Sequence, residues 1–206
     1  CELVRDREGT LARELGIRFL ITAVGTGSHG SWLDVEGRTP ADVIARFRTD
    51  DDRFDSPEQP GIDLIAASGA DVLVESTPLR HGGRLAIANV DAAFDAGMDV
   101  VTVNKGPIAW DYRRLRDRAS AEGRRLRHEG VTMDGCPVYN LAEFCLPGDR
   151  VIGFRGVLNS TSNYVLDAMA EGASRDEAVA EAIDAGIAET DPSYDLEGHD
   201  AAAKVA

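Results

Sequence analysis

The sequence predicts an α/β protein whose strands form a parallel sheet, and two observations carry this prediction. Along the first 130 residues, short apolar runs alternate with segments of helical periodicity. Each run is apolar throughout, without the every-second-residue alternation of a half-exposed strand. Strands of this kind are buried on both faces, as in parallel sheets that helices cover on two sides. After residue 130 the pattern changes, so we expect two domains, 1–130 and 131–206.

The individual elements follow from periodicity and from turn residues. Leucines at helical spacing predict a helix over 2–15. The apolar runs predict strands at 18–24, 71–76 and 99–104, and a short strand is expected at 125–130, with helices at 40–47, 83–97 and 111–123. In the second domain we expect a helix at 137–146, a longer strand at 151–159, and helices near 161–170, 174–185 and 198–206.

Composition excludes several classes of protein. With 43% hydrophobic and 28% charged residues, the chain is an ordinary globular protein. It has no run approaching the roughly 20 apolar residues of a membrane helix, and its charged N-terminus lacks the apolar core of a signal peptide. A net charge of −14 should repel nucleic acid and anionic membranes. The three cysteines form no C-x-x-C pair, so we expect a protein of the reducing cytoplasm.

A glycine motif, G-T-G-S-H-G at 25–30, has the spacing of a dinucleotide-binding fingerprint. That fingerprint requires a helix at its third glycine, whereas Gly37 and Pro40 would break one here. We therefore interpret the motif as the loop after the second strand of a nucleotide-binding fold, where it would meet the adenosine ribose. This loop has no carboxylate, and Ser28 and His29 could contact a 2′-phosphate, which favours NADP over NAD. A plain glycine turn is the alternative.

The two lysines, Lys105 and Lys204, stand out because the other basic residues are arginines. A lysine amine can exchange a proton, whereas a guanidinium stays protonated. Asn104 and Lys105 lie at the carboxyl end of the strand at 99–104, and Ser76 and Thr77 lie at that of the strand before it. Ligands of open α/β sheets bind at this carboxyl edge. We expect these residues to face a cofactor or substrate; the alternatives are a surface lysine beside a turn and a polar loop.

The segment 188–204 gathers five carboxylates before Lys204. Asp200 and Lys204 are four residues apart, so on a helix they share one face. Such a cluster would keep the lysine protonated and able to donate to a developing alkoxide, or would hold a substrate ammonium group. The alternative is an ordinary surface pair.

Two further segments carry polar groups. At 156–164 a strand is expected to join a helix, where Ser160 and Thr161 could bind a carboxylate or cap the helix. The loop 128–137 has glycines that could turn backbone carbonyls toward a hard cation, or could form a plain turn.

Taken together, these stretches resemble homoserine dehydrogenase. VESTP, VTVNKGPIA, EGVTMDGCPV, GVLNSTSNYVLDAM and AETDPSYDLEGHDAAAK occur in the family's order over about residues 60–206. The resemblance implies NAD(P)-dependent interconversion of L-homoserine and L-aspartate 4-semialdehyde. It also implies a Rossmann-like nucleotide domain, a mixed α/β substrate domain and a homodimer.

The resemblance also implies roles for single residues. Lys204, Lys105 and Asp200 would be catalytic, with Lys204 transferring the proton. Substrate contacts would come from Glu189, Asp195, Thr161 and Ser160, and cofactor contacts from Thr77, Ser76, Asn104 and Lys105. The loop 129–136 resembles a sodium site, with Glu129, Thr132, Asp134 and Cys136 at its positions and ligation mainly through main-chain oxygens. Two departures stand in this set: Ile187 replaces a usual tyrosine, and Ser160 a usual glycine.

Two other functions remain open from the sequence. One is a different Rossmann-type oxidoreductase, and the other is a degenerate homologue without activity. The chain starts at Cys1 and stops within a helical pattern, so both ends are expected to be cut. We expect such a fragment to bind cofactor poorly and to be inactive by itself.

Overall fold

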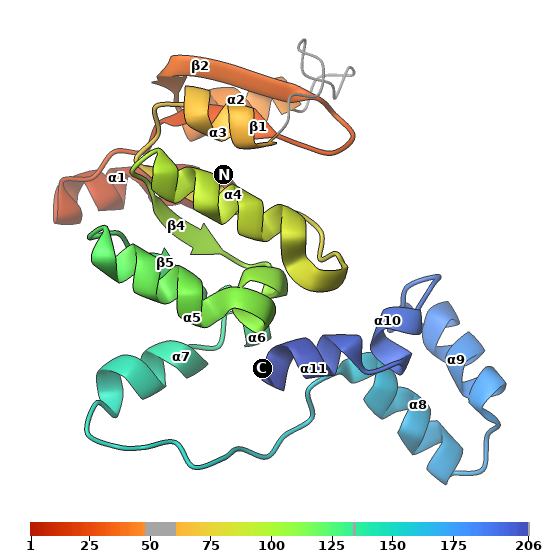
Figure 1. The fold of residues 1–206 in the computed structure, drawn as a ribbon. Coiled ribbons are helices and arrows are strands. Elements are labelled where there is room, and N and C mark those ends of the chain that lie inside the picture. Colours follow the sequence, from red (N-terminus) through yellow and green to blue (C-terminus); the bar gives the residue numbers. More distant parts are fainter. Residues whose placement is uncertain (48–60, 134, 206) are drawn as a thin grey trace.

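The computed structural model of the chain describes residues 1–47, 61–133 and 135–205. At its centre lies a three-stranded parallel sheet in the order β3 (Val72–Glu75), β4 (Asp99–Thr102) and β5 (Leu126–Arg127) (Figure 1). Val72 pairs with Asp99, and Val100 pairs with Leu126. The predicted α/β class with a parallel sheet is confirmed.

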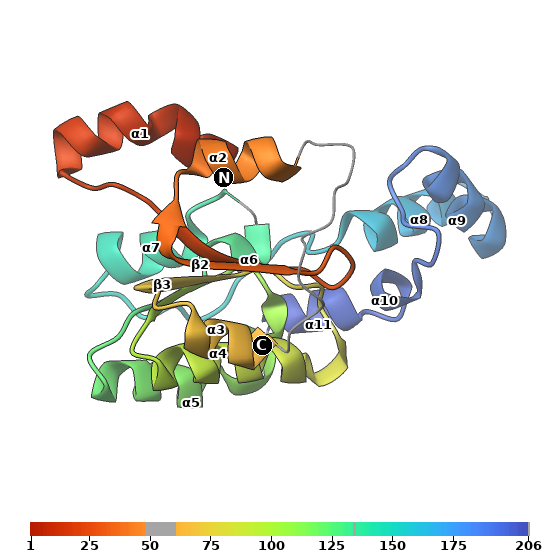
Figure 2. The same ribbon diagram turned by 90° about the horizontal axis from the view of Figure 1, so that it is seen from above.

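The main apolar core lies between this sheet and the helices that cover one of its sides. Figure 2 shows α3 (Gly61–Ala67), α4 (Arg84–Asp95) and α5 (Lys105–Ala121) together on one side of the strands, with α1 (Glu2–Leu15) and α2 (Pro40–Phe47) on the other. The core between α4, α5 and β4 contains Val90, Phe94, Met98, Val100 and Leu115, all at most 3% exposed. The helix bounds predicted for α1 and α2 agree with the structure.

Helix α5 begins six residues before its predicted start. Asn104 caps it, because its side-chain oxygen accepts a hydrogen bond from the amide of Gly106 at 2.8 Å. Asp111, where the sequence predicted the start, has non-helical backbone angles and marks a kink between two helical parts. The short helix η1 (His81–Gly83) precedes α4. Because α5 begins at Lys105, its first turn lies directly at the carboxyl end of β4.

The strand predicted at 18–24 does not join the parallel sheet, which corrects that part of the prediction. Instead, β1 (Ile21–Gly25) pairs antiparallel with β2 (Ser31–Arg38), a strand that the sequence analysis did not predict. The glycine motif forms the turn of this hairpin, where the Thr26 amide donates to the Gly30 carbonyl at 3.1 Å. Because a strand follows the motif instead of a helix, the fingerprint interpretation is excluded. The carboxylates of residues 50–52, some twenty positions after the motif, where the fingerprint has an acidic residue, lie outside the described residues.

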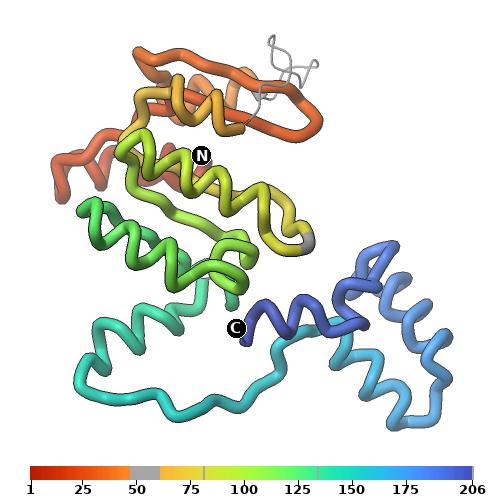
Figure 3. The backbone as a smooth tube through the Cα atoms, in the orientation of Figure 1, coloured from red at the N-terminus to blue at the C-terminus, as the bar shows by residue number. Residues whose placement is uncertain are grey.

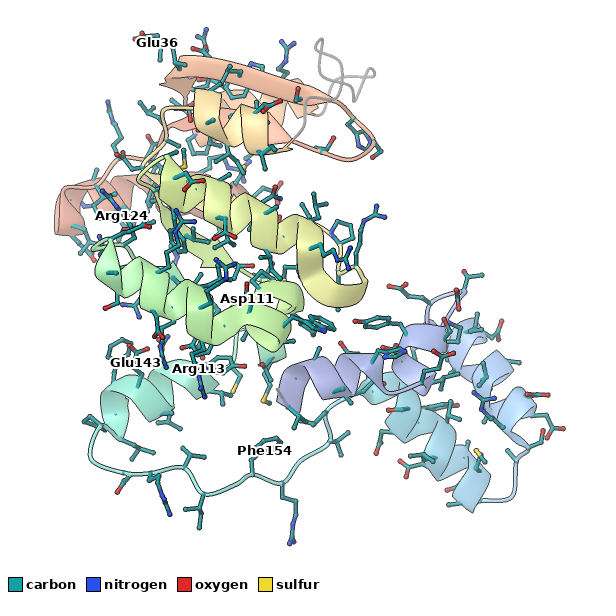
Figure 4. All side chains as sticks on the ribbon, in the orientation of Figure 1. Glu36, Asp111, Arg113, Arg124, Glu143 and Phe154 are labelled. Atoms are coloured by element: carbon teal, nitrogen blue, oxygen red, sulfur yellow. The ribbon has the colours of Figure 1, made fainter. Side chains whose placement is uncertain are left out.

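The second half begins with short helical turns. After β5 comes α6 (Gly130–Met133), which was not predicted. The helix predicted at 137–146 is present as α7 (Val138–Asn140), which continues directly into the π-helical turn η2 (Leu141–Cys145). The strand predicted at 151–159 is wrong, because no described segment pairs with it. An isolated strand leaves its backbone groups without partners. The segment runs across the open side of the molecule, with Ile152 90% and Phe154 64% exposed (Figure 4).

The last part of the chain is a small helical unit. The predicted helices are confirmed as α8 (Ser160–Ala170), α9 (Arg175–Asp184) and α11 (His199–Val205), and α10 (Ser193–Leu196) was not predicted. Val165 packs against Ala178 and Ala182 between α8 and α9. The tube in Figure 3 shows the chain returning through α11 toward α5, and α11 packs on α5. This contact brings the C-terminal residues to the carboxyl edge of the sheet. Among the described residues, no helix has the length and apolarity that crossing a membrane requires.

Replacing Gly106 by alanine is expected to lower the free energy of unfolding by about 2 kcal/mol. A Cβ at Gly106 would lie 2.6 Å from the Gly83 Cα, so the backbones at the starts of α4 and α5 would have to separate. Urea denaturation measures the change. Gly9→Ala is the matched control, because Gly9 lies inside α1 with only an Arg13 side-chain atom at 3.6 Å. That change should stabilise by up to about 1 kcal/mol, and equal effects of both variants would contradict the contact.

Candidate active site

Two strand ends and one returning helix build the candidate site. The residues after β3 and β4 meet at the carboxyl edge of the sheet, where the Asn104 side-chain amide donates to the Thr77 carbonyl at 2.8 Å and to its hydroxyl at 3.3 Å. Asn104 is 5% exposed and also caps α5. Thr77 and Asn104, both expected at this edge of the sheet, therefore contact each other. Ser76, the neighbour of Thr77, is exposed.

A single buried carboxylate lies between the two lysines. The Nζ atom of Lys105, at the start of α5, lies 3.2 Å from Asp200 Oδ1, and the Nζ atom of Lys204 lies 2.7 Å from Asp200 Oδ2. Asp200 is only 7% exposed. Lys204 also donates to the Leu158 carbonyl at 2.5 Å. The i,i+4 pair predicted on α11 is therefore joined by Lys105 from the other half of the molecule.

Asn159 is the site residue that sequence reasoning missed. Its side-chain amide donates to Asp195 at 2.8 Å and to Asp200 at 3.0 Å, while its oxygen accepts from the Ser162 amide at 2.8 Å. It is therefore the N-cap of α8, a role that the sequence analysis had offered to Ser160 or Thr161. The asparagine before a helical pattern was the available signal. It was overlooked because the segment before it had been assigned to a strand.

The ionised form of Asp200 is favoured in the folded protein. Burial by itself would raise the pKa of this carboxyl group. The hydrogen bonds from Lys204 and Asn159 and the positive charges of Lys105 and Lys204 outweigh burial, so the pKa of Asp200 lies below its ordinary value. The Asp200 carboxylate thus contacts the ammonium group of Lys105 through Oδ1, and the ammonium group of Lys204 and the side-chain amide of Asn159 through Oδ2.

Of the predicted substrate residues, only Asp195 has a described hydrogen bond to this cluster. Asp195 belongs to it through Asn159. Thr161 is buried and donates to the carbonyl of Ile187 at 3.3 Å, whereas Ser160 and Glu189 are exposed. Ser28 and His29 lie in the β1–β2 turn, where their side chains share a hydrogen bond of 2.8 Å. They are not part of the lysine cluster.

The predicted cation loop uses its side chains for internal contacts. The Glu129 carboxylate accepts from the amides of Tyr139 and Asn140 at 3.0 and 2.9 Å, and Thr132 shares a hydrogen bond with the Tyr139 hydroxyl. Cys136 is exposed, and Asp134 lies outside the described residues. Within the described part of the chain, no three His, Cys, Asp or Glu residues form a group that could hold a metal ion. Ligation through main-chain oxygens stays a prediction.

Comparison with known proteins gives the family. Residues 137–206 match the family model described as homoserine dehydrogenase. The chain is 42% identical to the homoserine dehydrogenase of Methanocaldococcus jannaschii over 193 residues, which are 91% of this chain and 57% of that protein. The chain belongs to the homoserine dehydrogenase family. It is also 36% identical to the NAD(+)-dependent homoserine dehydrogenase of Pseudomonas canavaninivorans, over 99% of this chain and 59% of that one.

A solved structure agrees with this family assignment. The crystal structure of homoserine dehydrogenase from Thermoplasma acidophilum matches with a TM-score of 0.76 and 29% identity, over 98% of this chain and 62% of that chain. The chain thus spans between 57% and 62% of these three homoserine dehydrogenases.

Proposed function

We propose that this chain forms the cofactor edge and the proton-transfer cluster of a homoserine dehydrogenase. The reaction is the NAD(P)-dependent interconversion of L-aspartate 4-semialdehyde and L-homoserine. One observation carries the proposal: the Asp200 carboxylate joins the ammonium groups of Lys105 and Lys204, which are the two lysines of the sequence, at the carboxyl edge of a parallel sheet. Ligands of such sheets bind at this edge.

The cluster suits the reduction of an aldehyde. A bound nicotinamide supplies the hydride, which adds to the carbonyl carbon and leaves negative charge on the oxygen. Lys204 donates the proton that this oxygen takes up, so the product is an alcohol. Asp200 holds the ammonium group of Lys204 in place at 2.7 Å. In the reverse direction Lys204 receives the same proton.

The residues at the sheet edge fit a nicotinamide cofactor. Thr77, Asn104 and Lys105 offer hydroxyl, amide and ammonium groups at the carboxyl ends of β3 and β4, and would hold its nicotinamide half. Ser28 and His29 would meet the adenosine half, and their turn carries no carboxylate of the kind that binds an NAD ribose. This feature favours NADP, whereas the name of the relative from Pseudomonas canavaninivorans favours NAD.

The substrate's amino-acid end requires an anionic partner for its ammonium group. Asp195, which accepts a hydrogen bond from Asn159, and the exposed Glu189 would bind that group. Thr161 and Ser160, at the start of α8, would contact the substrate carboxylate. These roles are proposals that rest on the family, and for Asp195 also on its connection to the lysine cluster through Asn159.

We also propose two domains, 1–130 and 131–206, and a homodimer in the cytoplasm. The exposed apolar side chains of Val151, Ile152, Phe154 and Val157 support an interface between subunits. Sedimentation of the protein from the complete open reading frame tests the dimer, and a monomer at micromolar concentration would contradict it.

The activity test uses the same protein and follows absorbance at 340 nm with L-aspartate 4-semialdehyde, comparing NADPH and NADH. We expect rapid oxidation, faster with NADPH if the hairpin turn binds a 2′-phosphate. Faster oxidation with NADH would contradict the NADP preference alone. No oxidation by a folded protein that binds either cofactor would contradict the homoserine dehydrogenase proposal and favour another oxidoreductase or a degenerate homologue.

A further inference from the structure

Glu75 is a buried carboxylate that the proposed reaction does not use. It is the last residue of β3 and is 2% exposed, and it pairs with Thr102 on β4. Fully buried glutamates are rare unless they are paired with a positive charge. None of the ion pairs found among the described residues involves Glu75. An apolar side chain would fill this position without the cost of burying a polar group. The presence of a carboxyl group here therefore requires a structural explanation.

The hydrogen bonds of Glu75 explain why a carboxyl group occupies this buried position. One carboxylate oxygen accepts from the Thr77 amide at 3.1 Å and from the Thr77 hydroxyl, and the other accepts from the Thr102 hydroxyl at 3.3 Å. Thr102 is fully buried and accepts in turn from the Asn104 amide at 3.0 Å. Because the Asn104 side chain donates back to Thr77, the four residues form a closed ring that ties the ends of β3 and β4 together.

The ring continues into the candidate active site. Asn104 caps α5 through the Gly106 amide, and the next residue after the cap, Lys105, reaches Asp200. Glu75 is thus connected by hydrogen bonds to the two segments that the proposed function assigns to the cofactor, directly to Thr77 and through Thr102 to Asn104. Three hydrogen bonds donated to the two oxygens of one side chain leave few alternative geometries.

We propose that Glu75 is a positioning residue, which fixes the Thr77 and Asn104 segments in the geometry that binds the nicotinamide cofactor. The proposal rests on the proposed function for the identity of the ligand. Glu75 itself touches neither cofactor nor substrate, and acts through Thr77 and through the cap of α5. A carboxamide at this position offers one acceptor atom instead of two, so Glu75→Gln leaves a buried donor of Thr77 or Thr102 without its acceptor.

The test compares Glu75→Gln with two matched controls in the protein from the complete open reading frame. Glu36→Gln makes the same chemical change at an exposed residue of β2 (Figure 4). Ser68→Ala removes a buried hydroxyl that donates to the Ile65 carbonyl at 2.8 Å, away from the ring. The dissociation constants of NADPH and NADH are measured by nicotinamide fluorescence. In the cofactor-free protein, hydrogen exchange reports on the Asn104 and Gly106 amides.

We expect Glu75→Gln to weaken binding of the preferred cofactor roughly tenfold and to speed exchange of both amides by a similar factor, which corresponds to one lost buried hydrogen bond. Both controls should keep cofactor binding within about twofold, even where Ser68→Ala lowers the melting temperature. Unchanged binding and exchange in a folded Glu75→Gln protein would overturn the proposal.

A second variant keeps the test decisive if Glu75→Gln does not fold. Thr102→Val preserves shape and removes one member of the ring, so the same weakening of cofactor binding is expected, and its absence would overturn the proposal. The proposed function fails separately: wild-type protein that binds the cofactor but does not reduce the semialdehyde would refute that function, while the Glu75 measurements would still decide the positioning role.

Discussion

Replacing Lys204 by alanine is expected to lower kcat for aldehyde reduction by about 10²–10⁴-fold, the usual contribution of a positioned proton donor. The ammonium group of Lys204 is fixed by Asp200 at 2.7 Å and by the Leu158 carbonyl at 2.5 Å, and its side chain is only 15% exposed. Because the proton is needed in the transition state and not in the bound substrate, kcat and kcat/KM should fall together. Steady-state kinetics at 340 nm on the protein from the complete open reading frame measure both.

The matched control is Arg38→Ala. Arg38 forms the same i,i+4 ion pair with Asp34 at 2.7 Å, but its side chain is 61% exposed on β2. An exposed pair contributes roughly 0–1 kcal/mol to stability, so this variant should keep its activity. Methylamine added to the Lys204→Ala protein should restore part of the rate, because a small ammonium ion can replace the missing one. An unchanged kcat in Lys204→Ala would exclude this lysine as the proton donor.

The sequence predicted the local half of this cluster and not the long-range half. The Asp200–Lys204 pair follows from helical spacing alone, because residues four apart share a helix face. The contact of Lys105 with Asp200 depends on α11 packing on α5. Periodicity contains no information about which helices pack together, so only the resemblance to a family placed the two lysines in one site.

The strands were the weakest part of the prediction for a related reason. A strand forms where its hydrogen-bonding groups find a neighbour, and such partners lie far away in the sequence. Residues 31–38 pair with β1 although no strand was predicted there, whereas 151–159 was predicted as a strand and has no described partner. That second error concealed Asn159, whose cap of α8 connects Asp195 with Asp200.

Replacing Asp200 by asparagine is expected to lower kcat/KM by about 100-fold, since small displacements of catalytic groups have effects of that order. Asparagine keeps the shape of the side chain but removes the charge that Lys105 and Lys204 share. Both ammonium groups would then repel each other across a neutral amide, and Lys204 would leave the position from which it donates. Steady-state kinetics at 340 nm measure the loss, and Asp34→Asn, at the exposed pair on β2, is the matched control.

The stability of the Asp200→Asn variant relative to wild type is also expected to depend on pH. Because the folded protein holds the pKa of Asp200 below its ordinary value, the ionised carboxylate stabilises the fold above the unfolded-state pKa of about 3.9. This stabilisation is lost as the pH falls through the lower folded-state pKa. Urea denaturation should therefore show wild type more stable than Asp200→Asn by a constant amount above about pH 5, with the difference shrinking below about pH 4. A difference that grows on acidification would mean that Asp200 is held protonated in the fold, and a protonated carboxyl group could not hold two lysines in place for proton transfer.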